Sequence, residues 1–154
     1  MLRLTIQNIN GPGIKVGKGS RSKIKGNQIS KCIYGIVSTS NRANIVMNNC
    51  FENHESGIKT IAKKNIRCDT RVQFNTCKKN KQHGVNCVGE NNFTVVTKNC
   101  ELSANTCTGV CAQDKASIKI TNNLIESNFA QGVLLVESTY AHIEKNILRK
   151  NYKA

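Results

Sequence analysis

The feature that most constrains this chain is a unit of about 23 residues that recurs along most of its length. The clearest copy runs from Ile120 to Val133 and reads apolar-x-x-Asn-x-apolar-x-x-Asn-x-x-x-Gly-aliphatic. The leading apolar residues of the copies are 21, 27, 24, 24 and 23 positions apart, at Ile24, Ile45, Val72, Val96, Ile120 and Ile143. Periods of this length are typical of solenoids, in which each coil packs only against its neighbours.

Each unit contains short apolar runs, such as residues 118–120 and 133–136, which are too short for helices and suit half-buried strands. The runs end at Asn or before Gly, so we expect glycines such as Gly84 and Gly132 to hold left-handed turns. Three strands and three turns per unit predict an all-β fold, a right-handed parallel β-helix of six to seven coils of 21–27 residues. Residues 1–154 are expected to form a single domain.

Asparagines recur at a fixed place in the unit. Stacking of the coils is expected to align their side-chain amides into a hydrogen-bonded ladder. The predicted members are Asn27, Asn48, Asn75, Asn99, Asn123 and Asn146.

The eight cysteines fit the same pattern as buried apolar residues. Cys50 and Cys77 occupy an inward position, Cys87 also points inward, and Cys32 replaces the second asparagine of its unit. The sequence has no Cys-x-x-Cys pair, so we expect no structural metal and no cofactor. Reduced cysteines and the lack of a recognisable signal peptide predict a cytoplasmic location, with the cytoskeleton as one possible site.

The formal net charge is +14, and nearly all of the excess lies in the first half of the chain. Residues 1–81 contain 16 lysines and arginines and 3 acidic residues, whereas residues 82–154 contain 7 and 6. Because inward positions are apolar, these cations must lie outside the first coils, where they favour an acidic partner. The residues predicted to bind this partner are Lys15, Lys18, Arg21, Lys23, Lys25, Lys63, Lys64, Arg67, Arg71, Lys78, Lys79 and Lys81.

An acidic protein surface, for instance on a cytoskeletal filament or a large complex, is the favoured partner. Nucleic acid is less favoured, because aromatic residues for base stacking are scarce in this half. An anionic polysaccharide and a merely solubilising charge remain as alternatives. The longest apolar run, residues 132–136, is too short to cross a membrane, so no membrane partner is expected.

Insertions fall after the Gly-aliphatic strand, at residues 61–71, 88–92 and 113–117. Variable loops on one edge of a solenoid commonly bind partners, although longer loops can also simply be tolerated there. The chain begins and ends in mid-coil, which predicts a segment of a longer solenoid, or ends capped by further coils or partner chains.

No catalytic motif is present. The sequence contains no Gly-x-Ser-x-Gly, His-Glu-x-x-His or phosphate-binding loop. Asp69 and Asp114 lie in different insertions among cations, and His83 and Cys87 are poorly spaced for a dyad in a strand. We therefore predict no catalytic residues.

The repeats, with Gly13 to Gly19 running into Lys25-Gly26-Asn27-Gln28-Ile29, resemble the parallel β-helix repeats of the pectin-lyase-like superfamily. They are most similar to the non-catalytic repeats of F-box-only proteins and of the periplasmic nitrous-oxide-reductase maturation protein. The resemblance covers residues 1–151 and implies the fold. The polysaccharide lyases of the superfamily use clustered aspartates to bind calcium and an arginine as base, and no such cluster maps onto this sequence.

Two functions follow from these observations. The favoured one is a non-enzymatic scaffold or protein-interaction module that docks an acidic surface through its basic first half. The alternative is a β-helix that binds or acts on an acidic polysaccharide. The scattered acidic residues favour the first, because a lyase or hydrolase site needs convergent carboxylates.

Overall fold

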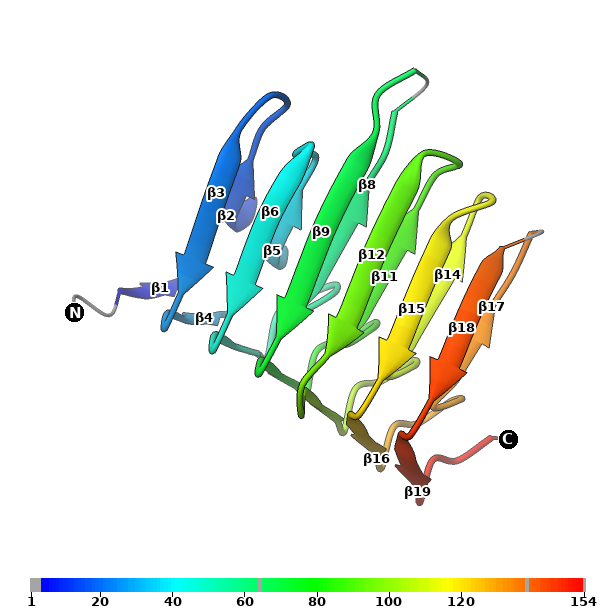
Figure 1. The fold of residues 1–154 in the computed structure, drawn as a ribbon. Helices are drawn as coiled ribbons and strands as arrows, with labels where there is room; N and C mark the ends of the chain where they lie inside the picture. Colours follow the sequence, from blue (N-terminus) through cyan, green and yellow to red (C-terminus); the bar gives the residue numbers. More distant parts are fainter. Residues whose placement is uncertain (1–3, 64, 138, 154) are drawn as a thin grey trace.

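The computed structural model describes residues 4–63, 65–137 and 139–153, which form a right-handed parallel β-helix of about six turns (Figure 1). Each complete coil contributes one strand to each of three parallel sheets. Every strand pairs with the equivalent strands of the adjacent coils, so residues of the same kind stack along the axis. The predicted fold class is confirmed.

The three sheets contain short strands throughout. Sheet A consists of β1 (Thr5–Gln7), β4 (Gln28–Ser30), β7 (Asn49–Phe51), β10 (Thr76–Lys78), β13 (Glu101–Ser103), β16 (Leu124–Glu126) and β19 (Ile147–Arg149). Sheet B consists of β2 (Pro12–Val16), β5 (Tyr34–Ser38), β8 (Ile58–Ile61), β11 (Val85–Val88), β14 (Val110–Gln113) and β17 (Val133–Leu135). Sheet C consists of β3 (Arg21–Lys25), β6 (Arg42–Val46), β9 (Cys68–Gln73), β12 (Asn92–Thr97), β15 (Ser117–Thr121) and β18 (Tyr140–Glu144). Among the described residues there is no helix that could span a membrane.

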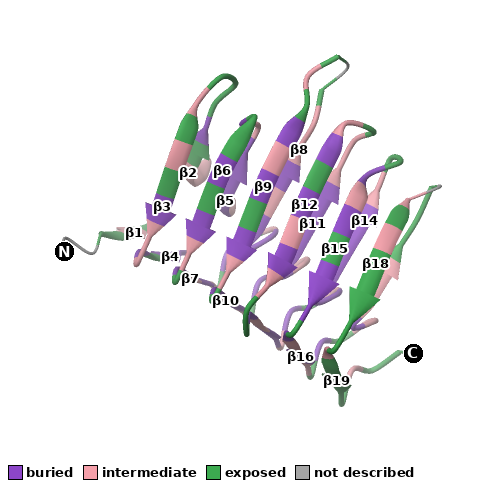
Figure 2. Ribbon diagram, in the orientation of Figure 1, coloured by how far each residue is buried: buried purple, intermediate pink, exposed green. Residues whose placement is uncertain are grey.

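The core lies between the three sheets and is built from stacked aliphatic and cysteine side chains. Alternate residues of each strand point inward, because successive side chains of a strand lie on opposite faces. In sheet C, Ile45 and Val72 are fully buried, whereas Arg42 and Arg71 are exposed. Figure 2 accordingly shows both buried and exposed segments along β6 and β9. The leading residues of the repeat are therefore core residues.

Two ladders of asparagines run along the turns that flank sheet A. In the first ladder, the Asn48 amide nitrogen donates to Asn75 Oδ1 at 3.1 Å, and that of Asn123 donates to Asn146 Oδ1 at 3.0 Å. The second ladder was not predicted from the sequence. In its first coil Cys32 takes the place of an asparagine, and its N–H donates to Asn53 Oδ1 at 3.2 Å. The asparagines of the second ladder are Asn53, Asn80, Asn105, Asn128 and Asn151.

The prediction for Asn99 is wrong. Asn99 is exposed, with φ at 57°, and Cys100 occupies its expected place in the first ladder. The Asn75 backbone N–H donates to the Cys100 sulfur at 3.5 Å, and the Cys100 N–H donates to Asn123 Oδ1 at 3.2 Å. The extra residue of this coil precedes the ladder position, so counting three residues from Val96 selects the wrong side chain.

The glycine before each aliphatic residue is required by close packing. Gly84 and Gly132 were expected in left-handed turns, but the described glycines with positive φ are Gly19, Gly26 and Gly89. A Cβ atom at Gly84 would lie 2.6 Å from the Gly109 carbonyl oxygen of the next coil. The left-handed turns beside the asparagines are held mostly by non-glycine residues, among them Met47, Glu52, Lys79 and Asn122.

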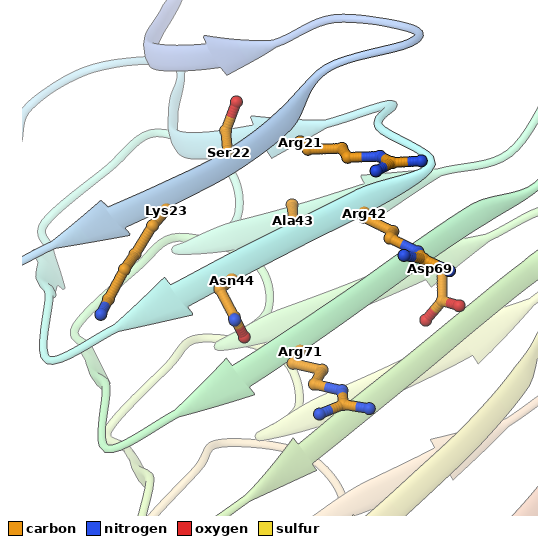
Figure 3. A pocket seen from close by; sticks show the side chains of 8 residues that line it. All are labelled: Arg21, Ser22, Lys23, Arg42, Ala43, Asn44, Asp69 and Arg71. Carbon is orange, nitrogen blue, oxygen red and sulfur yellow. The ribbon is translucent and has the colours of Figure 1, made fainter.

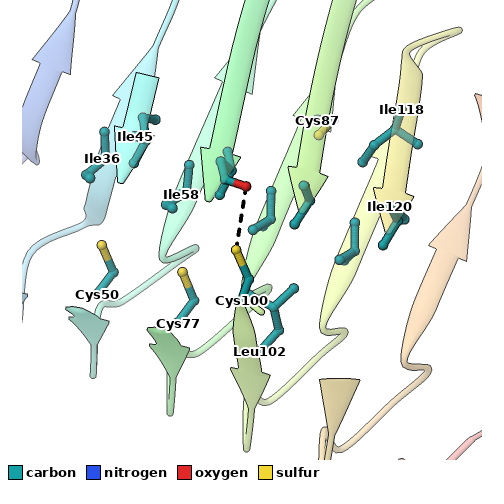
Figure 4. Packing of buried hydrophobic residues seen from close by; sticks show 14 of the residues in the cluster. Ile36, Ile45, Cys50, Ile58, Cys77, Cys87, Cys100, Leu102, Ile118 and Ile120 are labelled. Carbon is teal, nitrogen blue, oxygen red and sulfur yellow. Dashed lines mark hydrogen bonds between the residues drawn. The ribbon is translucent and has the colours of Figure 1, made fainter. Parts of the chain in front are cut away.

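Cysteines fill inward positions, as the repeat pattern predicted. Cys50, Cys77 and Cys87 are fully buried, and all eight cysteines are free thiols. Figure 4 shows Cys50, Cys77 and Cys100 on successive coils, together with the hydrogen bond from the Cys100 thiol to the Val72 carbonyl at 3.5 Å. They pack as small apolar side chains.

The turns between sheets B and C range from three to six residues in length. The longest of them connects β8 and β9, and its described residues, 62, 63 and 65–67, project furthest in Figure 1. The predicted insertion at residues 61–71 is therefore confirmed in place, although its outer residues belong to the two strands.

Candidate functional site

The outer face of sheet C carries two columns of side chains that cross all six of its strands. The strand register places equivalent residues of neighbouring coils opposite one another. The first column consists of Arg21, Arg42, Asp69, Phe93, Ser117 and Tyr140. The second column consists of Lys23, Asn44, Arg71, Val95, Lys119 and His142.

The first three strands of this sheet enclose an open hollow of about 570 Å³, which we call the arginine cavity (Figure 3). Its cations come from three successive coils, so they repeat at the coil spacing of about 4.8 Å. Its lining residues are Arg21, Ser22, Lys23, Arg42, Ala43, Asn44, Asp69 and Arg71.

The charges of the arginine cavity are poorly balanced. Asp69 is the acidic residue of the lining, and its carboxylate accepts from Arg67 Nη2 at 3.5 Å. Within the described part of the chain, Arg21, Arg42 and Arg71 make no ion pair shorter than 4 Å. The cavity therefore presents an excess of positive charge to solvent.

The last strands of sheet C form a smaller hollow of about 280 Å³, which we call the aromatic hollow. Its lining, mostly carbon, consists of Phe93, Thr94, Val95, Ser117, Ile118, Lys119, Tyr140 and His142. Tyr140 is 75% exposed, and Phe93 is 38% exposed. The Arg67 guanidinium lies over the Phe93 ring, 4.4 Å from its centroid, and so connects the hollow to Asp69 in the arginine cavity.

Comparison with known proteins identifies the family of this chain. A family model described as "Periplasmic copper-binding protein (NosD)" matches residues 4–154. The chain belongs to this family. Its fold is also similar to that of a double mutant of the periplasmic alginate epimerase AlgG, with a TM-score of 0.71 and 16% sequence identity. The match covers 95% of this chain and 36% of the epimerase chain, and at this identity it shows the fold alone. None of the curated proteins matches the chain.

The NosD family description corrects the expected location. Both this family and the epimerase are described as periplasmic, so the cytoplasmic prediction is wrong. The prediction relied on reduced cysteines, but thiols sealed in a core are protected from oxidation in any compartment. Free cysteines here therefore reflect packing, and they do not identify a reducing environment.

The copper in the NosD description has no matching donor set in the described residues. No group of three or more His, Cys, Asp or Glu among them could hold a metal ion. Cys50 and Cys77 stack on β7 and β10, where both are fully buried. The hydrogen bond with Cys50, together with burial, raises the pKa of the Cys77 thiol well above its usual value. This disfavours the thiolate that a metal would need, so these residues do not fit a copper site.

The predicted partner-binding residues are distributed over several faces. Sheet C carries Arg21, Lys23, Lys25 and Arg71, and the turns before this sheet carry Lys18, Lys63 and Arg67. Lys15 lies on sheet B, whereas Lys78, Lys79 and Lys81 lie in β10 and the turn that follows it. Lys64 lies outside the described residues. The structure thus brings Arg21, Lys23 and Arg71 together and separates them from the sheet A lysines.

Arg42 was missed from the sequence, although it lines the arginine cavity. It stands three residues before Ile45, as Arg21 stands three residues before Ile24, and the two pair in register. Aligning the first two repeats on their leading residues would have revealed the pair.

A second polar cluster lies at the start of the sheet B strands. Lys59 Nζ donates to Tyr34 Oη at 3.4 Å, and His83 Nδ1 lies 2.8 Å from Thr108 Oγ1. Burial, reinforced by Glu55, raises the pKa of Tyr34 to about 12. Burial and the nearby Lys59 charge lower the pKa of His83. At neutral pH, Tyr34 is therefore protonated and His83 is neutral. The charges of this cluster then come from Lys59 and Glu55, and its hydrogen bonds connect neighbouring coils.

Proposed function

We propose that this NosD-family protein is a non-catalytic binding module that holds an acidic polymer in the arginine cavity. The observation that supports this proposal is the convergence of Arg21, Lys23, Arg42 and Arg71 on one hollow that contains a single carboxylate. The sequence-based idea of an acidic partner is thereby narrowed to one face, and its proposed cytoplasmic setting is abandoned.

Arginine chemistry suits carboxylate ligands. A guanidinium presents several donors in a planar fork and can bind a carboxylate through two parallel hydrogen bonds. The pairing of Arg21 with Arg42 on adjacent strands repeats this fork at about 4.8 Å along the axis. A linear chain with one acid group per unit could therefore be bound by successive coils.

A binding role is favoured over catalysis by the distribution of acid groups in the cavity. General acid–base catalysis needs a positioned acid and base within reach of the substrate. The carboxylate of Asp69 is already engaged by Arg67, and the lining has no second carboxylate with which to form the aspartate cluster that accompanies the arginine base of the lyases. The alginate epimerase shares the fold at 16% identity, which makes an acidic polysaccharide a reasonable ligand but does not transfer the epimerase reaction.

The test reverses two charges of the cavity. We expect the double substitution Arg42→Glu and Arg71→Glu to weaken binding of alginate oligosaccharides on the order of 100-fold at low salt, because each carboxylate would meet a like charge. Isothermal titration calorimetry at low and physiological ionic strength measures the affinity and its screening by salt.

A matched control makes the same charge change elsewhere. Lys79 and Lys81 are exposed in the turn after β10, and Glu52 adopts the same left-handed conformation as Lys79 one coil earlier. Lys79→Glu with Lys81→Glu should therefore fold normally and keep most of the binding. Equal loss in both double variants would mean that net charge, and not the arginine cavity, determines binding. Failure of every acidic polymer to bind the wild-type protein would refute the proposed function.

A further inference from the structure

The arginine cavity and the aromatic hollow lie on the same face and follow one another along the solenoid axis. Asp69 of the cavity pairs in register with Phe93 of the hollow, and the first column then continues through Ser117 to Tyr140. Six coils at about 4.8 Å make this strip roughly 24 Å long. Side chains aligned in register in this way suit an extended polymer that runs parallel to the axis.

The two ends of the strip offer different chemistry. The first end is cationic, as shown above. At the second end, the rings of Phe93 and Tyr140 are separated by Ser117, whose small side chain leaves space between them. The rings are two coils apart, or about 10 Å. Polar groups from Lys119 and His142 border the same hollow.

A carbohydrate has chemical groups that suit both the cationic and the aromatic end of the strip. A sugar ring has an apolar C–H face that stacks on an aromatic side chain, and hydroxyl groups at its edge that bond to polar neighbours. A uronate adds one carboxylate per ring, which matches the cations of the first end. We infer that the acidic polymer is a uronate-containing polysaccharide that lies along sheet C, with carboxylates in the arginine cavity and a sugar ring on Tyr140. This inference rests on the proposed function and identifies its ligand class.

Nucleic acid, which also combines negative charge with stacking, fits the second end less well. A strand of nucleic acid carries a phosphate at every unit and needs cations along its whole path. Lys119 is the lysine that lines the aromatic hollow, and the nearby Glu144 carboxylate lies 2.8 Å from Lys145 Nζ and 3.2 Å from His142 Nε2. The aromatic hollow therefore carries fewer cations than the arginine cavity, which suits sugar ring faces better than a continuous row of phosphates.

The experiment compares the full chain's affinity for alginate oligosaccharides, for polyglutamate with the same number of carboxylates, and for single-stranded DNA. We expect the alginate oligosaccharides to bind about 3- to 10-fold more tightly than polyglutamate, the gain expected from stacking on an aromatic ring. Tyr140→Ala should remove this advantage, and Tyr140→Phe should keep most of it. Tyr152→Ala is the control, because Tyr152 is 81% exposed but lies outside sheet C.

The outcomes separate the two proposals. Equal affinity for alginate and polyglutamate, with no effect of Tyr140→Ala, would overturn the polysaccharide assignment while leaving the arginine cavity as a polyanion site. Tighter binding of DNA that is lost in Tyr140→Ala would overturn it in favour of nucleic acid. Binding of none of these probes would instead refute the proposed function itself. Circular dichroism of each variant confirms that the β-helix is intact.

Discussion

Replacement of Asn80 by alanine should destabilise the protein strongly, because its side chain connects three coils. Its Nδ2 group donates to the Cys50 carbonyl at 3.1 Å and to Asn105 Oδ1 at 3.0 Å. Its Oδ1 atom accepts from the backbone and side-chain nitrogens of Asn53, at 3.1 and 2.9 Å. Alanine removes all of these bonds and takes a partner from the Cys50 carbonyl and from the Asn53 N–H, both in the preceding coil.

The magnitude follows from the number of bonds and their burial. A typical intramolecular hydrogen bond contributes about 1 kcal/mol net, and a buried group left unsatisfied costs about 1–3 kcal/mol. Asn80 is fully buried, so water is poorly placed to replace the lost bonds. Some partners keep another bond: Asn105 Oδ1 still accepts from the Asn80 backbone N–H, and Asn53 Nδ2 still donates to the Ile29 carbonyl. We expect the free energy of unfolding to fall by about 3–5 kcal/mol.

Equilibrium urea unfolding followed by circular dichroism measures this change, and the slope shows whether the transition remains cooperative. Asn44→Ala is the matched control, since Asn44 is an exposed asparagine on β6, lies outside both ladders and has no left-handed backbone, so its loss should cost less than about 0.5 kcal/mol. A loss below about 1 kcal/mol for Asn80→Ala, or similar losses for the two variants, would refute the ladder as a major source of stability.

Three further changes test other parts of the fold. Gly84→Ala should lower the free energy of unfolding by about 2 kcal/mol or more, because its Cβ would lie 2.6 Å from the Gly109 carbonyl oxygen. Gly17→Ala is the control and should be nearly neutral, because a Cβ at Gly17 meets open space. Equal effects of the two substitutions in thermal unfolding would contradict the packing argument. His83 should make the free energy of unfolding fall as pH drops below about 6.5, its unfolded-state pKa, because the lowered pKa in the folded state disfavours protonation. Above that pH, His83 should have no effect on the pH dependence. His83→Gln should flatten this part of a plot of urea midpoint against pH, and an unchanged slope would contradict the assignment. In the native protein, Cys87 and Cys100 should resist a thiol reagent at mildly alkaline pH, since burial raises their pKa values to about 12 and about 11. The partly exposed Cys107 should react first, and mass spectrometry of the labelled protein identifies the sites. Early labelling of Cys87 would mean that the core opens.

The fold could be predicted because the repeat fixes both the inward residues and the sharp turns. Ile45 and Val72 are buried as their place in the unit predicts, and most of the asparagines at the ladder position stack as expected. Asn99 shows the limit of this reasoning. A single extra residue can be inserted on either side of a ladder position, and only the backbone conformation shows that Cys100 faces the neighbouring amides.

The glycines show a second limit. A repeated glycine can indicate either a left-handed conformation or a close contact, and the sequence pattern is the same in both cases. At Gly84 and Gly132, the contact with the following coil is the cause, and it depends on the stacking distance between coils. Left-handed turns at Met47, Glu52 and Lys79 carry no residue signature that would have identified them.

The basic half of the chain was identifiable from the sequence, but its division among faces was not. Three sheets share the cations, and the face on which a residue lies depends on its strand position and on the length of the preceding turn. Lys78 and Arg71 are seven positions apart, yet they lie on sheets A and C. A count of charges along the chain does not show that Arg42 lies beside Arg21. An alignment of the repeats strand by strand would have shown it.

The separation of core columns from surface columns explains why this fold indicates so little about function. In sheet C, the inward column Ile24, Ile45, Val72, Val96 and Ile120 is almost uniformly aliphatic, because each member must fill the same space between its neighbours. The outward columns have no such constraint, and they change from arginine through aspartate to aromatic residues within six coils. A ligand preference can therefore be rewritten one coil at a time without disturbing the ladder or the core. This is consistent with a shared fold at 16% identity to an epimerase, and it means that the ligand must be inferred from the outward columns of this chain itself.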